Sequence, residues 1–238
     1  LNQGLEAEMN LRLVQSPKVR WDVFANIATL NNEVKKLNNG EIVRKMDKFT
    51  GVDKEGEELG SFYGYKVLGV YRSDADVKLK KTDGSLYQGG DYIIEDLNKD
   101  GIINTLDRQI IGSPLPDFFG GFGTSFSFKS LTLSALFSYS YGNDVYNLLN
   151  QKLHSMSDYS NQSTDVTRRW LSPENPGDGF LPRAAYGDPS DNFATSDRWV
   201  EDGSYLKLKS VSINYDIPLR NRTGFFKAVS YTHLTLPT

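Results

Sequence analysis

The sequence predicts an all-β protein, an antiparallel transmembrane β-barrel with long extracellular loops. Several segments alternate apolar and polar residues over about 9–13 positions, whereas strands of soluble proteins average about 5–6 residues and barrel strands need about 9–11 to cross a bilayer. Aromatic residues make up 12% of the 238 residues, with 13 Phe and 13 Tyr. Transmembrane barrels use such residues in girdles at both membrane interfaces.

Two alternating segments open the chain. Period-two alternation indicates strands with one face in apolar surroundings. A turn signal, Gln15-Ser16-Pro17-Lys18, separates the two segments. The apolar positions of the first segment are Leu5, Ala7, Met9, Leu11 and Leu13, and those of the second are Trp21, Val23, Ala25 and Ile27, with Phe24 falling on the polar side of the second.

The clearest predicted hairpin covers residues 118–141. Lys129-Ser130 is expected to form its tight turn. One face of the hairpin is aromatic and aliphatic, and the other carries Ser, Thr and Gly. Such small residues suit a crowded or water-filled lumen, whereas a soluble sheet would carry charged residues on its solvent-exposed face. The apolar positions are Phe122, Thr124, Phe126 and Phe128, then Leu131, Leu133, Ala135, Phe137, Tyr139 and Tyr141.

Polar, turn-rich connections separate the predicted strands. Residues 31–60 are expected to form a loop or an irregular strand pair. The connection at 142–197 spans about 55 residues, which is unusual inside a compact soluble domain and expected for the extracellular loops of a barrel. The last strand region covers 198–218, where Val211, Ile213, Tyr215 and Ile217 alternate before Pro218.

Composition excludes several classes of protein. Lys and Arg total 27 against 30 Asp and Glu, a net charge of −3, which argues against a nucleic-acid partner. There are no cysteines, so disulfides and cysteine chemistry are excluded. No segment approaches the ~20 apolar residues of a transmembrane helix.

One loop has the spacing of calcium ligands. Residues 96–107 place oxygen donors at positions 1, 3, 5, 7, 9 and 12 of a calcium loop, with Gly101 at the sharp turn of position 6. An Asx-rich turn, whose side chains cap their own backbone, explains the same residues. In either case the expected role is structural, and calcium would order an extracellular loop. The candidate ligands are Asp96, Asn98, Asp100, the Ile102 carbonyl, Asn104 and Asp107.

No catalytic site and no other cofactor-binding site is expected. His154 and His233 are far apart and lack zinc spacing. The pair Glu201-Asp202 is more typical of hydrogen-bonded loop carboxylates than of the two acids of a glycosidase. The pair Gly120-Gly121 has no following helix or Lys, so it does not predict a phosphate loop. Aromatic side chains of the long loop suit sugar stacking and loop packing equally well: Tyr159, Trp170 and Phe180.

Three blocks together resemble the C-terminal barrel half of SusC/RagA-type TonB-linked outer-membrane proteins. Their order and spacing are more specific than any one alone, and the resemblance extends from about residue 4 to residue 229. The blocks are DLNKDGIINTLD at 96–107 with PDFFGG at 116–121, YGNDVY at 141–146, and RWVEDGSYLKLKSV at 198–211.

The resemblance implies a plugged barrel of 22 strands in the bacterial outer membrane. At ~10 residues per strand this chain would supply roughly eight strands as a C-terminal fragment, with the plug and TonB box upstream. The implied activity is TonB-dependent import of a nutrient, an oligosaccharide or a peptide. The implied partners are a SusD-like surface lipoprotein, TonB through the plug, and outer-membrane lipid. Residues 1–229 are expected to be native barrel, whereas 230–238 are expected to be a non-native tail.

Two alternatives remain at this point. A secreted, soluble β-rich module with a calcium-dependent binding loop fits the strands and the acidic loop. A surface glycosidase is the second, less favoured alternative. Extraction only by detergent and heat-modifiable migration would favour the barrel over both.

Overall fold

The chain is described from a computed structural model, covering residues 1–38, 40–46, 49–216 and 230–235. Strands dominate, and the described residues hold one α-helix, α1 (Leu148–Leu153). The chain divides into two compact units. The sheet unit comprises Asn2–Asn31, Leu115–Asn143 and Gly203–Thr238, and the loop unit comprises Leu1, Asn32–Pro114 and Asp144–Asp202.

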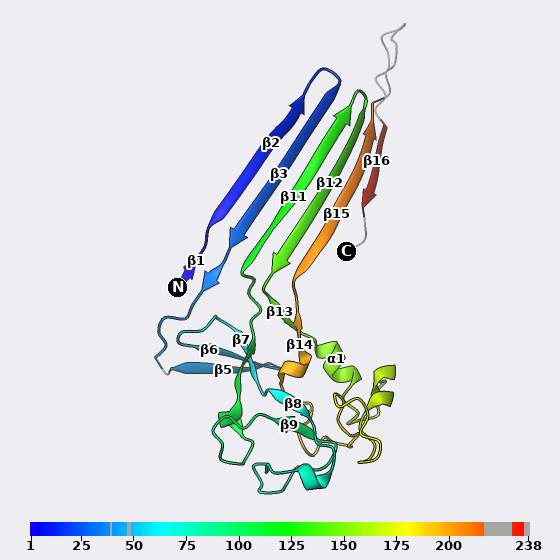
Figure 1. Cartoon of the computed structure of the whole chain (residues 1–238). Helices are drawn as coiled ribbons and strands as arrows, with labels where there is room; N and C mark the ends of the chain where they lie inside the picture. Colours follow the sequence, from blue (N-terminus) through cyan, green and yellow to red (C-terminus); the bar gives the residue numbers. More distant parts are fainter. Residues whose placement is uncertain (39, 47–48, 217–229, 236–238) are drawn as a thin grey trace. The chain divides into compact units, whose positions relative to one another are not determined.

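The sheet unit is one antiparallel sheet of six strands (Figure 1). Its order is β16-β15-β12-β11-β3-β2. Apart from β16, the strands have 10 or 11 residues, the length that a bilayer-crossing strand requires. Their bounds are β2 (Glu6–Gln15), β3 (Val19–Thr29), β11 (Phe118–Phe128), β12 (Leu131–Tyr141), β15 (Tyr205–Tyr215) and β16 (Ser230–Thr235).

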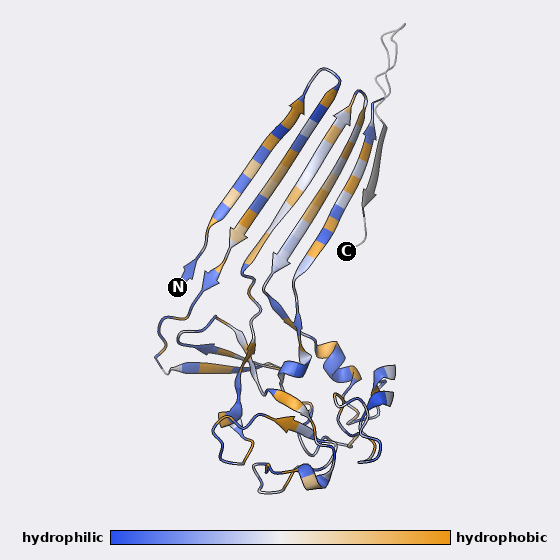
Figure 2. Cartoon of the chain, in the orientation of Figure 1, coloured by the Kyte–Doolittle hydropathy of each residue, from blue (hydrophilic) through white to orange (hydrophobic). Residues whose placement is uncertain are grey.

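The two faces of this sheet differ in polarity. Successive side chains of a strand point to opposite faces, and Figure 2 shows the resulting alternate bands of hydropathy. Cross-strand register carries one apolar row through Val23, Thr124, Ala135 and Val211, and the neighbouring polar row through Asp22, Ser125, Ser134 and Ser212.

Irregularities keep the two faces consistent. A bulge between Arg12 and Val14 leaves Leu13 out of the pairing, so Val14 lies opposite Trp21 and continues the apolar face. Phe24, the outlier of the sequence pattern, does lie on the polar face. Its ring covers Gly123, where an added Cβ would come within 2.5 Å of Phe24 Cε1. The large ring and the missing side chain are therefore complementary.

Aromatic contacts tie neighbouring strands together on the apolar face. Phe122 and Phe137 stack with ring centroids 4.8 Å apart. The Trp21 indole Nε1 donates to Thr124 Oγ1 at 2.8 Å, which satisfies its polar group beside apolar neighbours. The expected tight turn is present, with Lys129 at φ 54°.

The loop unit consists of short strands and turns. One sheet has the order β10-β7-β6-β5, and two-stranded ladders pair β8 with β9 and β13 with β14. The strand bounds are β5 (Glu41–Met46), β6 (Phe49–Lys54), β7 (Ser61–Gly64), β8 (Val67–Val70), β9 (Tyr92–Ile94), β10 (Gln109–Gly112), β13 (Asp144–Tyr146) and β14 (Val200–Asp202). Its short 3-10 helices are η1 (Asp74–Asp76), η2 (Thr105–Asp107), η3 (Thr164–Arg168) and η4 (Asp197–Trp199). Elsewhere in the chain, β1 (Asn2–Gln3) pairs with β4 (Asn31–Asn32).

Two small aromatic cores hold the loop unit. One contains Tyr71, Tyr87, Tyr92, Ile94 and Ile103, and the other contains Phe62, Tyr146 and Trp199. No helix in the described ranges is long and apolar enough to cross a membrane.

The predicted all-β antiparallel fold is confirmed. Residues 31–60 were expected to form either a loop or an irregular strand pair, and they contain the strand pair β5 and β6. Among the described residues the long sheet has six strands, where roughly eight were expected of the chain. Ile217 and Pro218, the predicted end of the last strand region, lie outside the described residues, and the predicted boundary at 229/230 stays a prediction.

Candidate functional site

The acidic loop lies between β9 and β10 in the loop unit. Its flanks are the strands β9 and β10, and its last three residues form η2. The left-handed backbone of Gly101, with φ 81°, makes the sharp turn. Asp96 Oδ2 accepts from the Gly101 amide at 2.8 Å. The loop therefore folds back on its first carboxylate.

The buried end of the loop is Asp107, whose side chain is fully enclosed. Its two oxygens accept from the Leu97 amide at 3.0 Å and the Asn104 amide at 2.8 Å. One carboxylate thus joins the start of the loop to its end. Both bonds go to backbone donors, as in the Asx-turn interpretation.

The remaining candidate ligands cap neighbouring backbone. Asp100 Oδ1 accepts from the Ile102 amide at 2.7 Å, and Asn98 Oδ1 accepts from the Asp100 amide at 3.0 Å. Asn104 Nδ2 donates to the Ile102 carbonyl at 3.2 Å. Within the described residues, no group of three or more His, Asp or Glu side chains is placed to hold a metal.

One carboxylate oxygen in the loop lacks a hydrogen-bond donor among the described residues. Asp96 Oδ1 is buried and has no hydrogen-bond partner in the described part of the chain. A buried carboxylate oxygen without a donor is unfavourable, and a hard cation is one group that would satisfy it. The loop therefore fits either Asx turns alone or Asx turns around calcium, and calcium stays a prediction.

A larger cavity of about 990 Å³ lies wholly within the loop unit. Its volume is at the upper end of the ~300–1,000 Å³ typical of ligand sites. Aromatic and apolar side chains form part of the wall: Phe49, Tyr65, Tyr87, Ile94, Ile103 and Phe193. Burial raises the pKa of the Tyr87 phenol, so this group is neutral at ordinary pH.

Arg108 lines this cavity, and its guanidinium lies over an aromatic ring. Its guanidinium carbon lies 5.2 Å from the Tyr65 ring centroid. The Nε atom is buried and has no hydrogen-bond partner among the described residues. No local sequence pattern predicts this cavity, because its wall joins segments between residues 45 and 195 that are distant along the chain.

A buried carboxylate, Asp91, connects three segments of the loop unit. Its oxygens accept from Arg183 Nε at 2.8 Å, Ser190 Oγ at 2.8 Å, Asn192 Nδ2 at 3.1 Å and the Gln88 amide at 2.8 Å. Asp91 is completely enclosed, whereas the Arg183 side chain is 22% exposed. The sequence does not predict this cluster around Asp91, since three of its four partners lie 92 to 101 residues away along the chain.

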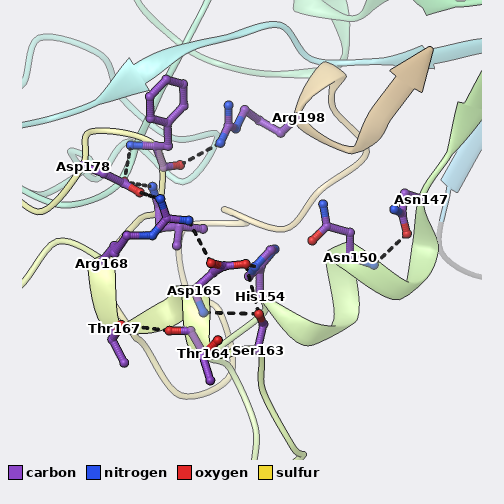
Figure 3. Close-up of polar contacts among 12 residues, drawn as sticks. Asn147, Asn150, His154, Ser163, Thr164, Asp165, Thr167, Arg168, Asp178 and Arg198 are labelled. Carbon is purple, nitrogen blue, oxygen red and sulfur yellow. Dashed lines mark hydrogen bonds and ion pairs between the residues drawn. The ribbon is translucent and has the colours of Figure 1, made fainter.

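His154 belongs to a second polar cluster (Figure 3). Its Nε2 lies 3.7 Å from Asp165 Oδ2, and its ring stacks on Trp199 at 6.3 Å. Arg168 donates to Asp165 at 2.9 Å and lies 3.8 Å from Asp178. The hydrogen bond from Ser163 and the nearby Arg168 hold the pKa of Asp165 below its usual range. The surroundings of His154 are those of a packed loop residue; the side chain of His233 lies outside the described set.

The other residues singled out from sequence have structural partners. Glu201 accepts from the side-chain amides of Asn147 (2.9 Å) and Asn150 (3.2 Å). The Trp170 indole donates to the Arg72 carbonyl at 3.0 Å. Phe180 has the Arg198 guanidinium 4.9 Å from its ring, and the Tyr159 ring, although 93% exposed, has its centroid 5.4 Å from that of Tyr186. Gly120 and Gly121 lie within β11, which is followed along the chain by β12 and not by a helix.

The polar face of the long sheet carries a charged cluster. Arg12 Nε donates to Asp22 Oδ1 at 2.8 Å, and Arg20 donates to Asp22 Oδ2. Ser125 and Ser127 line the same hollow, of about 590 Å³. Two guanidiniums on one carboxylate give this three-residue cluster a formal charge of +1.

Comparison with known proteins places the chain. It is 31% identical over 224 residues to TonB-dependent receptor P3 of Formosa agariphila, covering 91% of this chain. The chain is a homologue of TonB-dependent receptors. TonB-dependent receptor SusC of Bacteroides thetaiotaomicron is 24% identical, across 96% of this chain. The chain spans 22% of the length of each of these two relatives. No family model matches it.

Solved structures share the fold. A chain of the RagAB peptide transporter superposes with a TM-score of 0.70 at 19% identity, over 90% of this chain and 22% of that one. The "closed-closed" state of the RagAB peptide importer gives 0.72 at 18% identity, over 95% of this chain and 24% of that one. The predicted resemblance is thereby confirmed. TonB-dependent receptors are outer-membrane β-barrel proteins, so the predicted outer-membrane location is also confirmed.

Proposed function

We propose that the protein carrying this chain imports a nutrient, an oligosaccharide or a peptide, across the bacterial outer membrane in a TonB-dependent manner. The observation that supports it most directly is the long sheet. Its strands match a bilayer in length, one face is apolar, and the other carries hydroxyls, glycines and a charged cluster. A water-filled lumen suits the second face, and lipid suits the first.

The proposed partners follow from the relatives. SusC and the RagAB transporter support a SusD-like surface lipoprotein at the extracellular side and TonB at the periplasmic side. Outer-membrane lipid would cover the apolar face. The relatives are named as receptors or transporters, and we propose no covalent chemistry for this chain.

Uptake and location test this proposal together. The full-length protein should enter the outer-membrane fraction, require detergent for extraction and migrate anomalously before heating. Cells expressing it should take up a labelled oligosaccharide or peptide, and deletion of tonB should abolish that uptake. A water-soluble full-length product would instead support the secreted binding module.

We further propose that the 96–107 loop binds calcium as a structural ion. Support comes from the oxygen spacing and from the buried, unpartnered Asp96 Oδ1. Calcium should protect the loop of the intact protein from protease, and chelator should reverse this. Asp100→Asn should weaken the protection, whereas Asp83→Asn, in a different exposed turn, should not. Equal cleavage with and without calcium would contradict the idea.

A further inference from the structure

The cavity of the loop unit holds charges of both signs. Its lining includes four cationic side chains, Lys45, Lys81, Arg108 and Lys152, and three carboxylates, Asp83, Asp158 and Asp191. Charged groups on a wall that also holds several aromatic rings are costly unless they are paired or in contact with water or a ligand. The pairing of each group therefore indicates which one is available for a solute.

Two of the carboxylates cap their own turns. Asp83 Oδ1 accepts from the Ser85 amide at 2.8 Å and from Ser85 Oγ at 2.6 Å. Asp158 Oδ1 accepts from the Ser160 amide at 2.9 Å and from the Ser160 hydroxyl. Among the cations, the Lys81 ammonium donates to the Pro189 carbonyl at 3.4 Å.

Arg108 is held in place without an ion pair. Its guanidinium lies over Tyr65, and Arg108 takes part in none of the ion pairs found among the described residues. Its buried Nε donor has no partner there. A planar guanidinium presents its N–H groups as a rigid fork that matches the two oxygens of a carboxylate.

We propose that this cavity binds a carboxylate-bearing part of the imported solute, with Arg108 as the residue that recognises the carboxylate. The proposal rests on the proposed import function and deepens it by naming the ligand chemistry. The apolar wall at Tyr87 and Phe193 would pack against the uncharged remainder of the solute. Lys152 would add to the positive potential of the cavity without the geometry of the fork.

A carboxylate of this kind comes from two sources, a uronic acid in an oligosaccharide or the C-terminus of a peptide. Calorimetry on the purified full-length protein in detergent separates them. The probes are trigalacturonate against its methyl ester, and tetra-alanine against its C-terminal amide. One acid should bind at least about tenfold more tightly than its neutral partner, since tenfold corresponds to about 1.4 kcal/mol, near the lower end for a charged hydrogen bond.

Variants assign the effect to the residue. Arg108→Gln should remove the preference for the acid, and Arg108→Lys should restore only part of it. Lys78→Gln is the matched control, because Lys78 is exposed and does not line the cavity. Heat-modifiable migration reports whether each variant is folded.

The probes and the Arg108→Gln variant have three outcomes that count against the proposal. Equal binding of each acid and its neutral partner, binding of neither acid, or an unchanged preference in Arg108→Gln would overturn it. Loss of uptake in the tonB deletion with no acid preference would leave import standing and remove the site. Acid-selective binding without any TonB-dependent uptake would do the reverse.

Discussion

The buried carboxylate of Asp91 should control the stability of the loop unit. Asp91→Ala removes the acceptor of four hydrogen bonds, including the charged bond from Arg183. Asn192 and Ser190 are themselves buried, so their donors would be left without partners and without water. Each such donor costs about 1–3 kcal/mol.

The net loss of stability in Asp91→Ala should be smaller than the summed costs of the four hydrogen bonds. Arg183 is 22% exposed and can turn to solvent, which limits the cost of its lost partner. Breaking a buried pair by removing one member typically costs about 3–5 kcal/mol. We expect a loss in this range in the free energy that opens the loop unit.

Hydrogen exchange of the full-length protein measures this loss. Amides of peptides covering 87–92 and 183–192 should exchange at least about a hundredfold faster, because each 1.4 kcal/mol is about tenfold. Glu57→Ala is the control, since Glu57 is exposed and only its backbone N–H and C=O are hydrogen-bonded among the described contacts. Wild-type protection in Asp91→Ala would refute the assignment of Asp91 as the centre of this cluster.

Three further predictions address pH, the membrane face and packing. Burial raises the pKa of Asp188. The protonated carboxyl therefore contributes fully to stability below about pH 4, and this contribution is lost as pH rises through the raised pKa. Asp188→Asn should flatten the pH dependence of hydrogen-exchange protection over that pH range. Val211→Arg should destabilise the barrel in lipid by about 2–4 kcal/mol in urea titrations, whereas Ser212→Arg on the opposite face should not; equal effects would contradict the assignment of faces. Gly123→Ala should cost about 1–3 kcal/mol in the same titration by meeting the Phe24 ring, and Phe24→Leu should recover part of that loss.

Local patterns were sufficient for the sheet. Alternation over Trp21, Val23 and Ala25, and again over Leu131, Leu133 and Ala135, predicted both the strands and their apolar face. The period of two is a backbone property, so it survives without knowledge of any partner. The turn at Lys129-Ser130 was equally local.

The same reasoning predicted the residues of the acidic loop but not whether they bind calcium. Spacing brought Asp96, Asp100 and Asp107 into one loop, and the structure places them there. It did not separate calcium ligands from backbone caps, because both uses favour the same residues at the same intervals. Which oxygens keep a free lone pair depends on the folded backbone.

Tertiary structure alone decided the cavity and the cluster around Asp91. Tyr65 and Arg108 meet on one wall, and Asp91 reaches Arg183 across some ninety residues of sequence. Phe24 is the intermediate case: its side of the strand was readable, but its reason, the bare backbone of Gly123 on the neighbouring strand, was not. The sequence determines the alternation of side chains along a strand. Contacts between distant segments depend on how the connecting loops fold, and this folding has no periodic pattern in the sequence.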